Sequence, residues 1–438
     1  MASVEENRIQ ARPQNESYKT FEVVDHIKTG VQWDNQISEK LRWESYVFYA
    51  FRDFEGKIPI KSNGYIDLVR NYYGLGSALE FQPNNHHRMQ VRFSTANQKD
   101  LRKRYQNLSG TQGDNVLDQA ENFYNTALSF LDEIKWDFGL VRAGLRYDYQ
   151  RFGTQNSVDE VRLHSLNPSL GFTYTQLGNH VLFTSYSSSF ETPTLNELSA
   201  NPDGSPGFNA DLSPSKAHNF ELGWRWKTSN AMLNANLYYM GYKNQLVLTG
   251  AIDQVGAPIR ANSGDSYRRG IELEGAWAFA PHWNWQANLS WSKNRNRDKY
   301  FKRDGALEAL GDTHLAFSPS LIAAQQLTYT LNDWSVSFVS KYVGEQYMGN
   351  IDAELSKLEG YLINDIQVQA LLLHKENGPT LNLNLHLHNI FDTLISSNGY
   401  FYTYDDDYSV PNVVTTIEGV GYYPQAGRHF MAGLTFTF

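Results

Sequence analysis

Polar and apolar residues alternate with a period of two along most of this sequence. In 381–387 four leucines occupy every second position, and two asparagines and a histidine stand between them. The same alternation runs through 141–149, 219–226, 231–239 and 271–277. A period of two indicates β-strands whose side chains point to opposite faces. The pattern therefore predicts long strands that separate an apolar surface from a wet one.

The lengths of the strands and connections distinguish a soluble β-sandwich from a membrane barrel. Sandwich strands are mostly about 5–6 residues long, whereas the strand segments here extend over 10–18 residues. Short turns are expected near 38–40, 83–86, 137–138, 178–179, 229–230, 281–282, 332–333 and 375–379. Longer polar connections are expected at 53–64, 106–116, 153–164, 191–215, 248–265, 298–316, 349–358 and 392–420. This layout favours an all-β, antiparallel transmembrane β-barrel with short periplasmic turns and long extracellular loops.

The segmentation predicts about 17 strands between residue 18 and the C-terminus. They are 18–37, 41–55, 65–82, 87–105, 117–135, 139–152, 165–177, 180–190, 216–228, 230–247, 266–280, 283–297, 317–331, 333–348, 359–373, 380–391 and 421–438. Antiparallel closure needs an even number, so an odd count leaves the first and last strands parallel or the wall open at two edges. Traced back from the turns, the first strand begins on the extracellular side. We therefore expect the front part of the barrel to be missing from this sequence.

Composition fits this architecture. Aromatic residues make up 14% of the chain, yet its mean hydropathy is −0.52 and its longest apolar run, Tyr46–Phe51, is far too short for a spanning helix of about 20 residues. Abundant aromatic residues argue against disorder. The net charge of −9 argues against a nucleic-acid partner, and the absence of cysteine excludes disulfides and thiolate sites. Residues 1–20 contain no apolar segment of a signal peptide.

Several motifs resemble those of TonB-dependent outer-membrane receptors, and the resemblance covers essentially the whole chain. They are Gly144–Asp148, Ser189–Leu198, Leu212–Pro214, Asn219–Gly223, Arg269–Glu274, Asn389–Asp392 and Gly427–Arg428, with an aromatic C-terminus at Phe438. The sequence looks nearest to the ferric-citrate and siderophore branch of that family.

This resemblance implies a 22-stranded barrel in the outer membrane of a Gram-negative-type bacterium, of which 1–438 would supply the last 17 strands. The family's plug domain, TonB-contacting box and signal peptide are not expected in 1–438, so the TonB system would be reached only through the missing N-terminal part. The implied function is energised uptake of a ferric siderophore or related metal complex, without a cofactor. Outer-membrane lipid and lipopolysaccharide would surround the wall, and Phe438 would be read by the outer-membrane assembly machinery.

Candidate ligand contacts lie in the polar connections. Tyrosines supply stiff amphipathic surface, carboxylates can meet a cation, and guanidinium groups suit the oxygens of an anionic ferric complex. The candidates are Tyr400, Tyr402, Tyr404, Asp405, Asp406, Asp407, Arg268, Arg269 and Arg297. The alternatives are a solvated loop with an aromatic girdle for 399–408, and arginines that pair with lumen glutamates or lipopolysaccharide phosphates.

The sequence also leaves functions other than gated uptake open. His386 and His388 share the lumen face, where lumen hydrogen bonding is favoured over a metal site. No Ser/His/Asp set stands out, so we do not expect an enzyme, although a dispersed set in a surface protease or lipase stays an alternative. A passive porin-type channel and a non-functional truncated receptor fragment are two further hypotheses.

Overall fold

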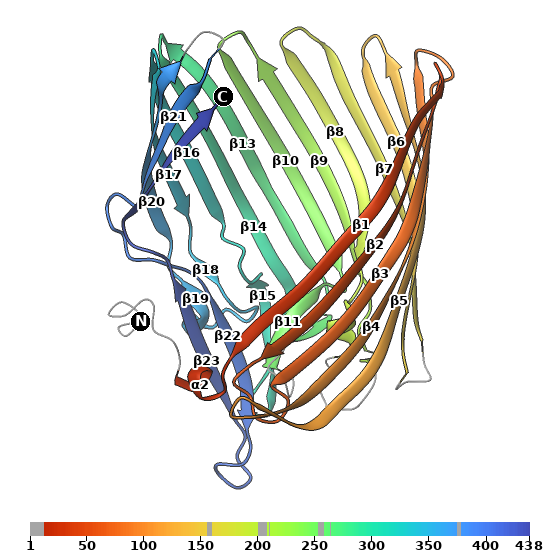
Figure 1. Cartoon of the computed structure of the whole chain (residues 1–438), viewed down its shortest axis with the longest axis vertical. Coiled ribbons are helices and arrows are strands. Elements are labelled where there is room, and N and C mark those ends of the chain that lie inside the picture. Colours follow the sequence, from red (N-terminus) through yellow and green to blue (C-terminus); the bar gives the residue numbers. More distant parts are fainter. Residues whose placement is uncertain are drawn as a thin grey trace.

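The computed structural model describes residues 13–155, 160–199, 208–209, 211–252, 258–262, 264–374 and 378–438. One antiparallel sheet of 18 strands dominates this part of the chain and curves into a barrel-like wall (Figure 1). Seventeen of its strands form the wall, each pairing with the next along the chain. They are β1 (Phe21–Ser38), β2 (Leu41–Lys57), β3 (Tyr65–Phe81), β4 (His87–Leu108), β5 (Thr111–Trp136), β6 (Gly139–Thr154), β7 (Val161–Leu177), β8 (His180–Glu191), β9 (Ser215–Lys227), β10 (Ala231–Lys243), β13 (Ser266–Ala280), β14 (Trp283–Arg303), β16 (Leu321–Leu331), β17 (Trp334–Val343), β20 (Tyr361–His374), β21 (Thr380–His388) and β24 (His429–Thr437).

The remaining elements lie toward the lower end of Figure 1, where α2 precedes β1 and the others belong to the longer connections. The eighteenth strand of the sheet is β15 (Ala306–His314), which pairs with the end of β14 that extends beyond β16. These elements are α2 (Pro13–Ser17), α3 (Leu195–Ser199), β11 (Leu246–Ile252), β12 (Pro258–Asn262), β15 (Ala306–His314), β18 (Gln346–Tyr347), η1 (Glu354–Ser356), β19 (Lys357–Leu358), β22 (Ser396–Asp406) and β23 (Thr415–Pro424). No helix of the described ranges is long and apolar enough to cross a membrane.

The predicted antiparallel wall of 17 strands is confirmed, but several predicted boundaries are wrong. The connection expected at 298–316, for example, contains the end of β14, up to Arg303, and all of β15 (Ala306–His314). The connection expected at 106–116 is strand on both sides of a two-residue turn, because β4 and β5 pair up to Leu108 and Thr111, and Ser109 and Gly110 both adopt positive φ. The last strand was expected over 421–438. Its first residues belong instead to β23, and β24 starts at His429. The expected turn at 375–379 lies partly outside the described residues.

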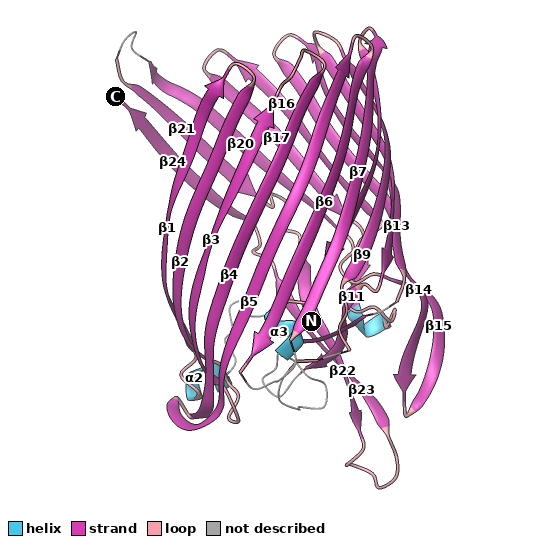
Figure 2. Cartoon of the chain, turned by 90° about the vertical axis from the view of Figure 1, so that its right-hand side faces the viewer, coloured by secondary structure: helices cyan, strands magenta, loops and turns pink. Residues whose placement is uncertain are grey.

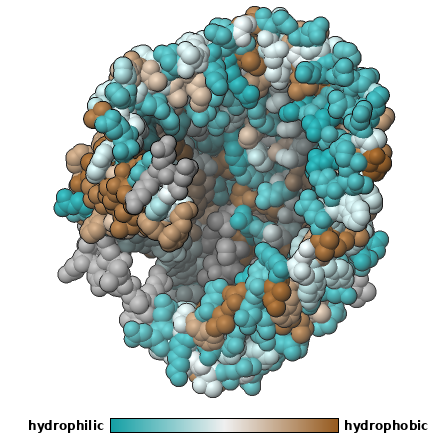
Figure 3. All heavy atoms as spheres, turned by 45° about the horizontal axis from the view of Figure 1, so that its top comes forward, coloured by the Kyte–Doolittle hydropathy of each residue, from teal (hydrophilic) through white to brown (hydrophobic). Residues whose placement is uncertain are grey.

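Alternation divides the wall into two faces, as the period of two requires. Large apolar side chains such as Leu145, Leu222 and Trp291 are 46%, 56% and 60% exposed, so they lie on a surface rather than in a core. Hydrophilic residues dominate the surface around the hollow in Figure 3. Stacked aromatic rings, including Trp136 on Phe138, mark the end with the short turns, as in the aromatic girdles of membrane barrels. The apolar face is therefore the outer face, and the polar face lines the lumen.

The wall ends in two edge strands. Among the described residues, β1 pairs only with β2, and β24 pairs only with β21. Because 17 strands alternate in direction, β1 and β24 run the same way. Only an odd number of antiparallel strands can connect two edges of that kind.

Candidate functional site

A small hydrophobic core closes part of the long-loop end. The Ser189–Leu198 motif supplies Leu195 and Leu198, which pack with Phe152, Leu212 and Leu246. At the start of α3, the Glu197 carboxylate accepts the Thr194 backbone N–H at 2.7 Å and the Thr194 hydroxyl accepts the Glu197 N–H at 3.3 Å. This reciprocal arrangement is a capping box. The motif therefore has a structural role, which is to fold the connection after β8 onto the wall.

Strands β22 and β23 form a hairpin that extends beyond the wall at the long-loop end (Figure 2). The rings of Tyr400, Tyr402 and Tyr404 stack in sequence, with centroids 6.2 and 6.4 Å apart. The facing strand carries glycine where these rings cross it: a Cβ at Gly421 would lie 2.3 Å from Tyr400 Cζ, and one at Gly419 would lie 2.2 Å from Tyr402 Cζ. Glycine is thus required there for the tyrosines to lie flat across the hairpin.

The opposite face of this hairpin contacts the tip of the β14–β15 hairpin. Arg303 Nη1 lies 2.9 Å from a Glu418 carboxylate oxygen. The Asp304 N–H donates to the Thr416 hydroxyl at 2.8 Å, and the Thr416 N–H donates to the Asp304 carboxylate at 2.7 Å. An ion pair and two reciprocal hydrogen bonds therefore join two connections that are more than a hundred residues apart in the chain.

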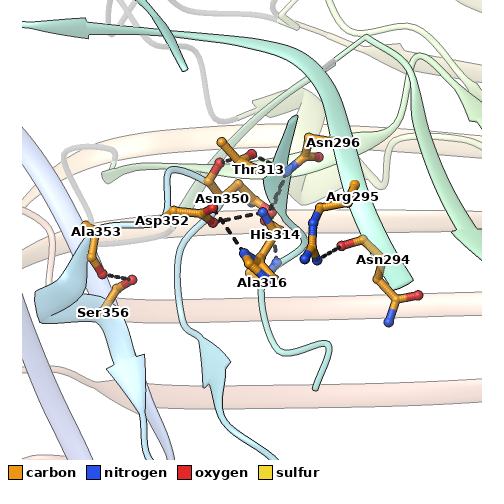
Figure 4. A network of polar contacts seen from close by, with 10 residues as sticks. All are labelled: Asn294, Arg295, Asn296, Thr313, His314, Ala316, Asn350, Asp352, Ala353 and Ser356. Atoms are coloured by element: carbon orange, nitrogen blue, oxygen red, sulfur yellow. Dashed lines mark hydrogen bonds and ion pairs between the residues drawn. The ribbon is translucent and has the colours of Figure 1, made fainter. Parts of the chain in front are cut away.

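A third connection, between β17 and β20, is fixed to the base of β14–β15 by a polar network (Figure 4). Asp352 accepts the His314 backbone N–H at 2.8 Å and contacts the His314 ring nitrogen Nδ1 at 3.0 Å. Asn296 is fully buried, and its amide donates toward Thr313 and Asn350 at 3.2 and 3.4 Å. The long-loop end is thus cross-connected through side chains as well as through the wall.

Two of the three adjacent aspartates are engaged within the hairpin. Asp405 accepts the Thr416 hydroxyl at 3.0 Å and lies 3.8 Å from the Lys302 ammonium group. Asp406 accepts the backbone N–H groups of Tyr408 and Ser409. Hydrogen bonds from the side chain and backbone of Ser409 hold the pKa of Asp406 below its usual value. Asp407 is exposed. Within the described ranges, no group of three or more His, Asp or Glu residues is arranged to hold a metal ion.

Arg268 lines a lumen pocket of about 340 Å³ between β10, β13 and β14. Its guanidinium lies 4.1 Å from the centroid of the Tyr242 ring. Arg268 Nη1 and Asn236 Oδ1 are both buried with no hydrogen-bond partner among the described residues. An unsatisfied buried donor or acceptor costs about 1–3 kcal/mol. The pocket therefore presents one free donor and one free acceptor, with the carboxylates of Glu221 and Glu272 also in its lining.

The candidate arginines do not share a site. Arg268 and Arg269 are consecutive in β13, so their side chains point to opposite faces. Arg269 and Arg297 lie with Ile271 and Trp291 on the outer face, away from the lumen pocket. The sequence did not single out Asn236 or Tyr238 as pocket residues. Their positions on the polar face of β10, one pairing step from β13, were the available signal.

The two histidines of β21 lie in a row of three imidazoles. The rings of His386 and His388 have centroids 5.8 Å apart, and His429 of β24 stacks on His388 at 4.9 Å. His388 Nδ1 lies 3.3 Å from an Asp365 carboxylate oxygen. Neighbouring rings stack at interplanar angles of 16° and 22°, and the contact with Asp365 is a lumen hydrogen bond of His388.

Comparison with known proteins gives one family match and many structural neighbours. A family model described as TonB dependent receptor-like, beta-barrel, matches residues 7–390. Pesticin receptors of Yersinia enterocolitica and Yersinia pestis are 37% and 35% identical over 73 and 77 residues, which is 17% of this chain and 10% of each relative.

Solved structures resemble the chain along nearly its whole length. The ferric yersiniabactin uptake receptor FyuA from Yersinia pestis has a TM-score of 0.69 at 14% identity and covers 95% of this chain and 61% of its own. The siderophore receptor PiuA from Acinetobacter baumannii has a TM-score of 0.68 at 17% identity, with 96% and 65% covered. The ferric citrate transporter FecA has a TM-score of 0.71 at 18% identity, with 95% and 62% covered. The chain spans less than two thirds of each of these proteins.

Proposed function

Because the chain belongs to the family of TonB-dependent receptor β-barrels, which lie in the outer membrane of Gram-negative bacteria, we propose that it forms the wall of a receptor for energised uptake of a ferric siderophore or related metal complex. Binding and passage, rather than catalysis, are the roles assigned to its residues. The proposal concerns the lumen and the long-loop end, where polar side chains surround a hollow.

The lumen pocket at Arg268 is the observation that carries this proposal. Its free guanidinium N–H suits an anionic oxygen of an iron chelator, such as a carboxylate or hydroxamate oxygen. The free amide oxygen of Asn236 suits a hydroxyl or amine of the same molecule. Glu221 and Glu272 disfavour a ligand that is anionic throughout. We assign Arg268 and Asn236 as a paired contact for a chelator that carries both an acceptor and a donor.

The tyrosine face of the β22–β23 hairpin is the second proposed contact. Tyr400, Tyr402 and Tyr404 belong to β22, in the hairpin that extends beyond the wall at the long-loop end, where an incoming complex would arrive first. Aromatic rings offer contact area at small cost in side-chain entropy. Asp405 and Asp406 are already engaged within the hairpin, so the tyrosines rather than the aspartates are expected to bind the complex.

Binding measurements on the purified protein test the assignment. Ferric citrate and a ferric hydroxamate siderophore are the probes, and their affinities are measured by titration calorimetry. We expect Arg268→Gln to weaken binding at least tenfold, because a charged hydrogen bond is lost. The matched control is Arg225→Gln, an arginine of β9 on the lumen face outside this pocket. Equal affinities of the wild type and both variants would overturn the role of Arg268.

Uptake is tested in cells grown under iron limitation. Deletion of the gene should abolish growth on the ferric complex that binds, while growth on freely available iron is unchanged. Undiminished growth on every ferric chelator would argue against iron uptake. Free diffusion of small sugars through the reconstituted protein would favour a passive channel instead.

A further inference from the structure

A stripe of uncharged polar residues follows the lumen face of β14 from the short-turn end of the wall up to the Arg268 pocket. Ser290 and Ser292 line that pocket, so alternation assigns the even-numbered positions of β14 to the lumen. From 284 to 294 these positions all carry an amide or a hydroxyl: Asn284, Gln286, Asn288, Ser290, Ser292 and Asn294. At roughly 3.3 Å per residue, this neutral stripe is about 33 Å long. It therefore connects the pocket with the other end of the wall.

The neighbouring strands widen the neutral stripe near the short-turn end. The strand register places Gln326 of β16 beside Gln286, and Ser337 of β17 beside Thr328 of β16. The Gln326 amide donates to the hydroxyls of both Thr328 and Ser337 at 3.1 Å, and these two hydroxyl oxygens are 2.8 Å apart. The side chains of this surface thus satisfy one another with hydrogen bonds between neutral groups.

A cavity of about 490 Å³ lies at the short-turn end of this surface. Its lining includes amide and hydroxyl side chains from β16, β17, β20, β21 and β24, namely Thr330, Ser335, Gln369, Asn382, Asn384 and Thr435. The strand register connects these positions with Ser337 and so with the lumen face. Asp333, in the turn before β17, is the charged residue of the described lining. Lys341 and Asp365 also face the lumen, but they lie closer to the long-loop end. This short-turn cavity is therefore a largely neutral, hydrogen-bonding site.

The lumen face of β1–β6 differs at the same end of the wall. Ion pairs with N–O distances of 2.5 to 2.8 Å line it, and they are Arg42–Asp34, Arg88–Glu80 and Arg142–Glu133. Hydrogen bonds to ionised groups are roughly twice as strong as those between neutral groups. Conduction requires sites that bind a solute but still release it. The neutral surface meets this requirement better than the charged one, because a polar solute exchanges only weak contacts along it.

We propose that the short-turn cavity is an exit site for the transported metal complex, which reaches it from the Arg268 pocket along the neutral stripe. The cavity has the size of a ligand pocket, about 300–1,000 Å³. Its amides and hydroxyls suit a chelate with carbonyl, amide or hydroxyl groups on its surface. Glu272 and Glu274 of β13 border the stripe, so a chelate without net negative charge is favoured. This inference rests on the proposed uptake and adds a route and a second site to it.

Uptake and binding are measured separately in iron-limited cells. The probes are ferric citrate and a ferric hydroxamate siderophore without net negative charge, both labelled with radioactive iron, and binding is measured in energy-depleted cells. Gln369→Trp fills the cavity from an exposed position and should slow uptake about tenfold, which corresponds to a barrier raised by about 1.4 kcal/mol. Binding at the Arg268 pocket should not change. The matched control is Gln90→Trp, between Arg88 and Arg92 on the lumen face of β4, and it should take up the probe at the wild-type rate.

Two further variants test the chemistry of the exit site. Gln369→Asn keeps the amide and should transport normally. Gln369→Glu keeps the size but adds a negative charge, so it should slow ferric citrate more than the ferric hydroxamate. This dependence on charge decides the matter if Gln369→Trp does not assemble in the membrane.

The outcomes separate the route from the uptake function. If the wild type takes up neither probe, both the uptake function and the exit site are wrong. If the wild type takes up a probe and Gln369→Trp does so at the same rate, only the exit site is wrong. Equal slowing in Gln369→Trp and Gln90→Trp, or equal slowing of both probes in Gln369→Glu, would also overturn it.

Discussion

Replacing Arg102 by Met should destabilise the wall by about 3–5 kcal/mol, because a buried carboxylate would lose its cation. Arg102 Nη2 lies 3.1 Å from Glu121 Oε2, and the side chains are 9% and 0% exposed. Asp100 of β4 stands directly opposite Glu121 of β5 in the strand register. Like charges in that position repel, and a bidentate contact from Arg70 to Asp100, at 2.6 and 2.9 Å, neutralises the second carboxylate.

The size of this loss of stability follows from the interactions that Glu121 keeps when Arg102 is replaced. In Arg102→Met, Glu121 keeps the Gln119 amide, which donates at 2.8 Å, but loses the ion pair with Arg102 and still faces Asp100. Methionine keeps most of the side-chain volume, so the loss is electrostatic rather than a cavity. Adding Glu121→Gln removes the stranded charge and should recover most of the stability, because two neutral groups can replace a buried ion pair at little cost.

Urea unfolding in phospholipid vesicles, followed by tryptophan fluorescence, measures the effect. Arg162→Met is the matched control: its partner Glu160 lies 2.8 Å away, but the side chains are 65% and 39% exposed. An exposed pair contributes at most about 1 kcal/mol. A loss below 1 kcal/mol for Arg102→Met, or no recovery in the double variant, would refute the reasoning.

Three further predictions concern the long-loop end. Leu198→Ala should cost about 2–5 kcal/mol of unfolding free energy, because Leu198 is fully buried in the small core. The control is Leu355→Ala, since Leu355 is 44% exposed. Equal losses in the two variants would contradict this prediction. Gly421→Val should displace the Tyr400 ring and raise its nitration by tetranitromethane several-fold, whereas Gly433→Val, at an open position, should not. The lowered pKa of Asp406 means that its contribution to the hairpin tip is present above its unfolded pKa of about 3.9 and is lost as the pH falls through the lower folded value. A spin label at Val410→Cys, the single cysteine of that variant, should therefore stay immobile down to about pH 4, and earlier release would show that Asp406 does not order the tip.

The wall could be predicted strand by strand because a membrane imposes the same alternation on every strand. Leu381–Leu387 is a clear case, since its leucines face lipid and its asparagines face the lumen. The alternation ends where the wall leaves the membrane. Residues 106–116 contain Gln, Asn, Ser and Gly and look like a loop, yet β4 and β5 continue through them by backbone pairing in water.

The sequence predicted on which face of the wall each candidate arginine lies, but it did not predict which residues the candidate side chains contact. Alternation alone places Arg268 in the lumen and Arg269 outside, once Ile271 and Leu273 are assigned to lipid. The hairpin of β22 and β23 was not predictable, because tyrosines alternate there with residues that pack against other connections. The pairs Arg303–Glu418 and Arg102–Glu121 depend on which strands and connections meet, and spacing in one sequence does not determine that.

The cross-connections at the long-loop end bear on how such a protein can diversify. The β14–β15 tip contacts the β22–β23 hairpin through Asp304 and Thr416, and its base contacts the next connection through His314 and Asp352. A graft of one connection from a homologous receptor would leave buried partners such as Asn296 unmatched. These three segments are therefore expected to be exchanged in recombination, or in engineering, as a single block.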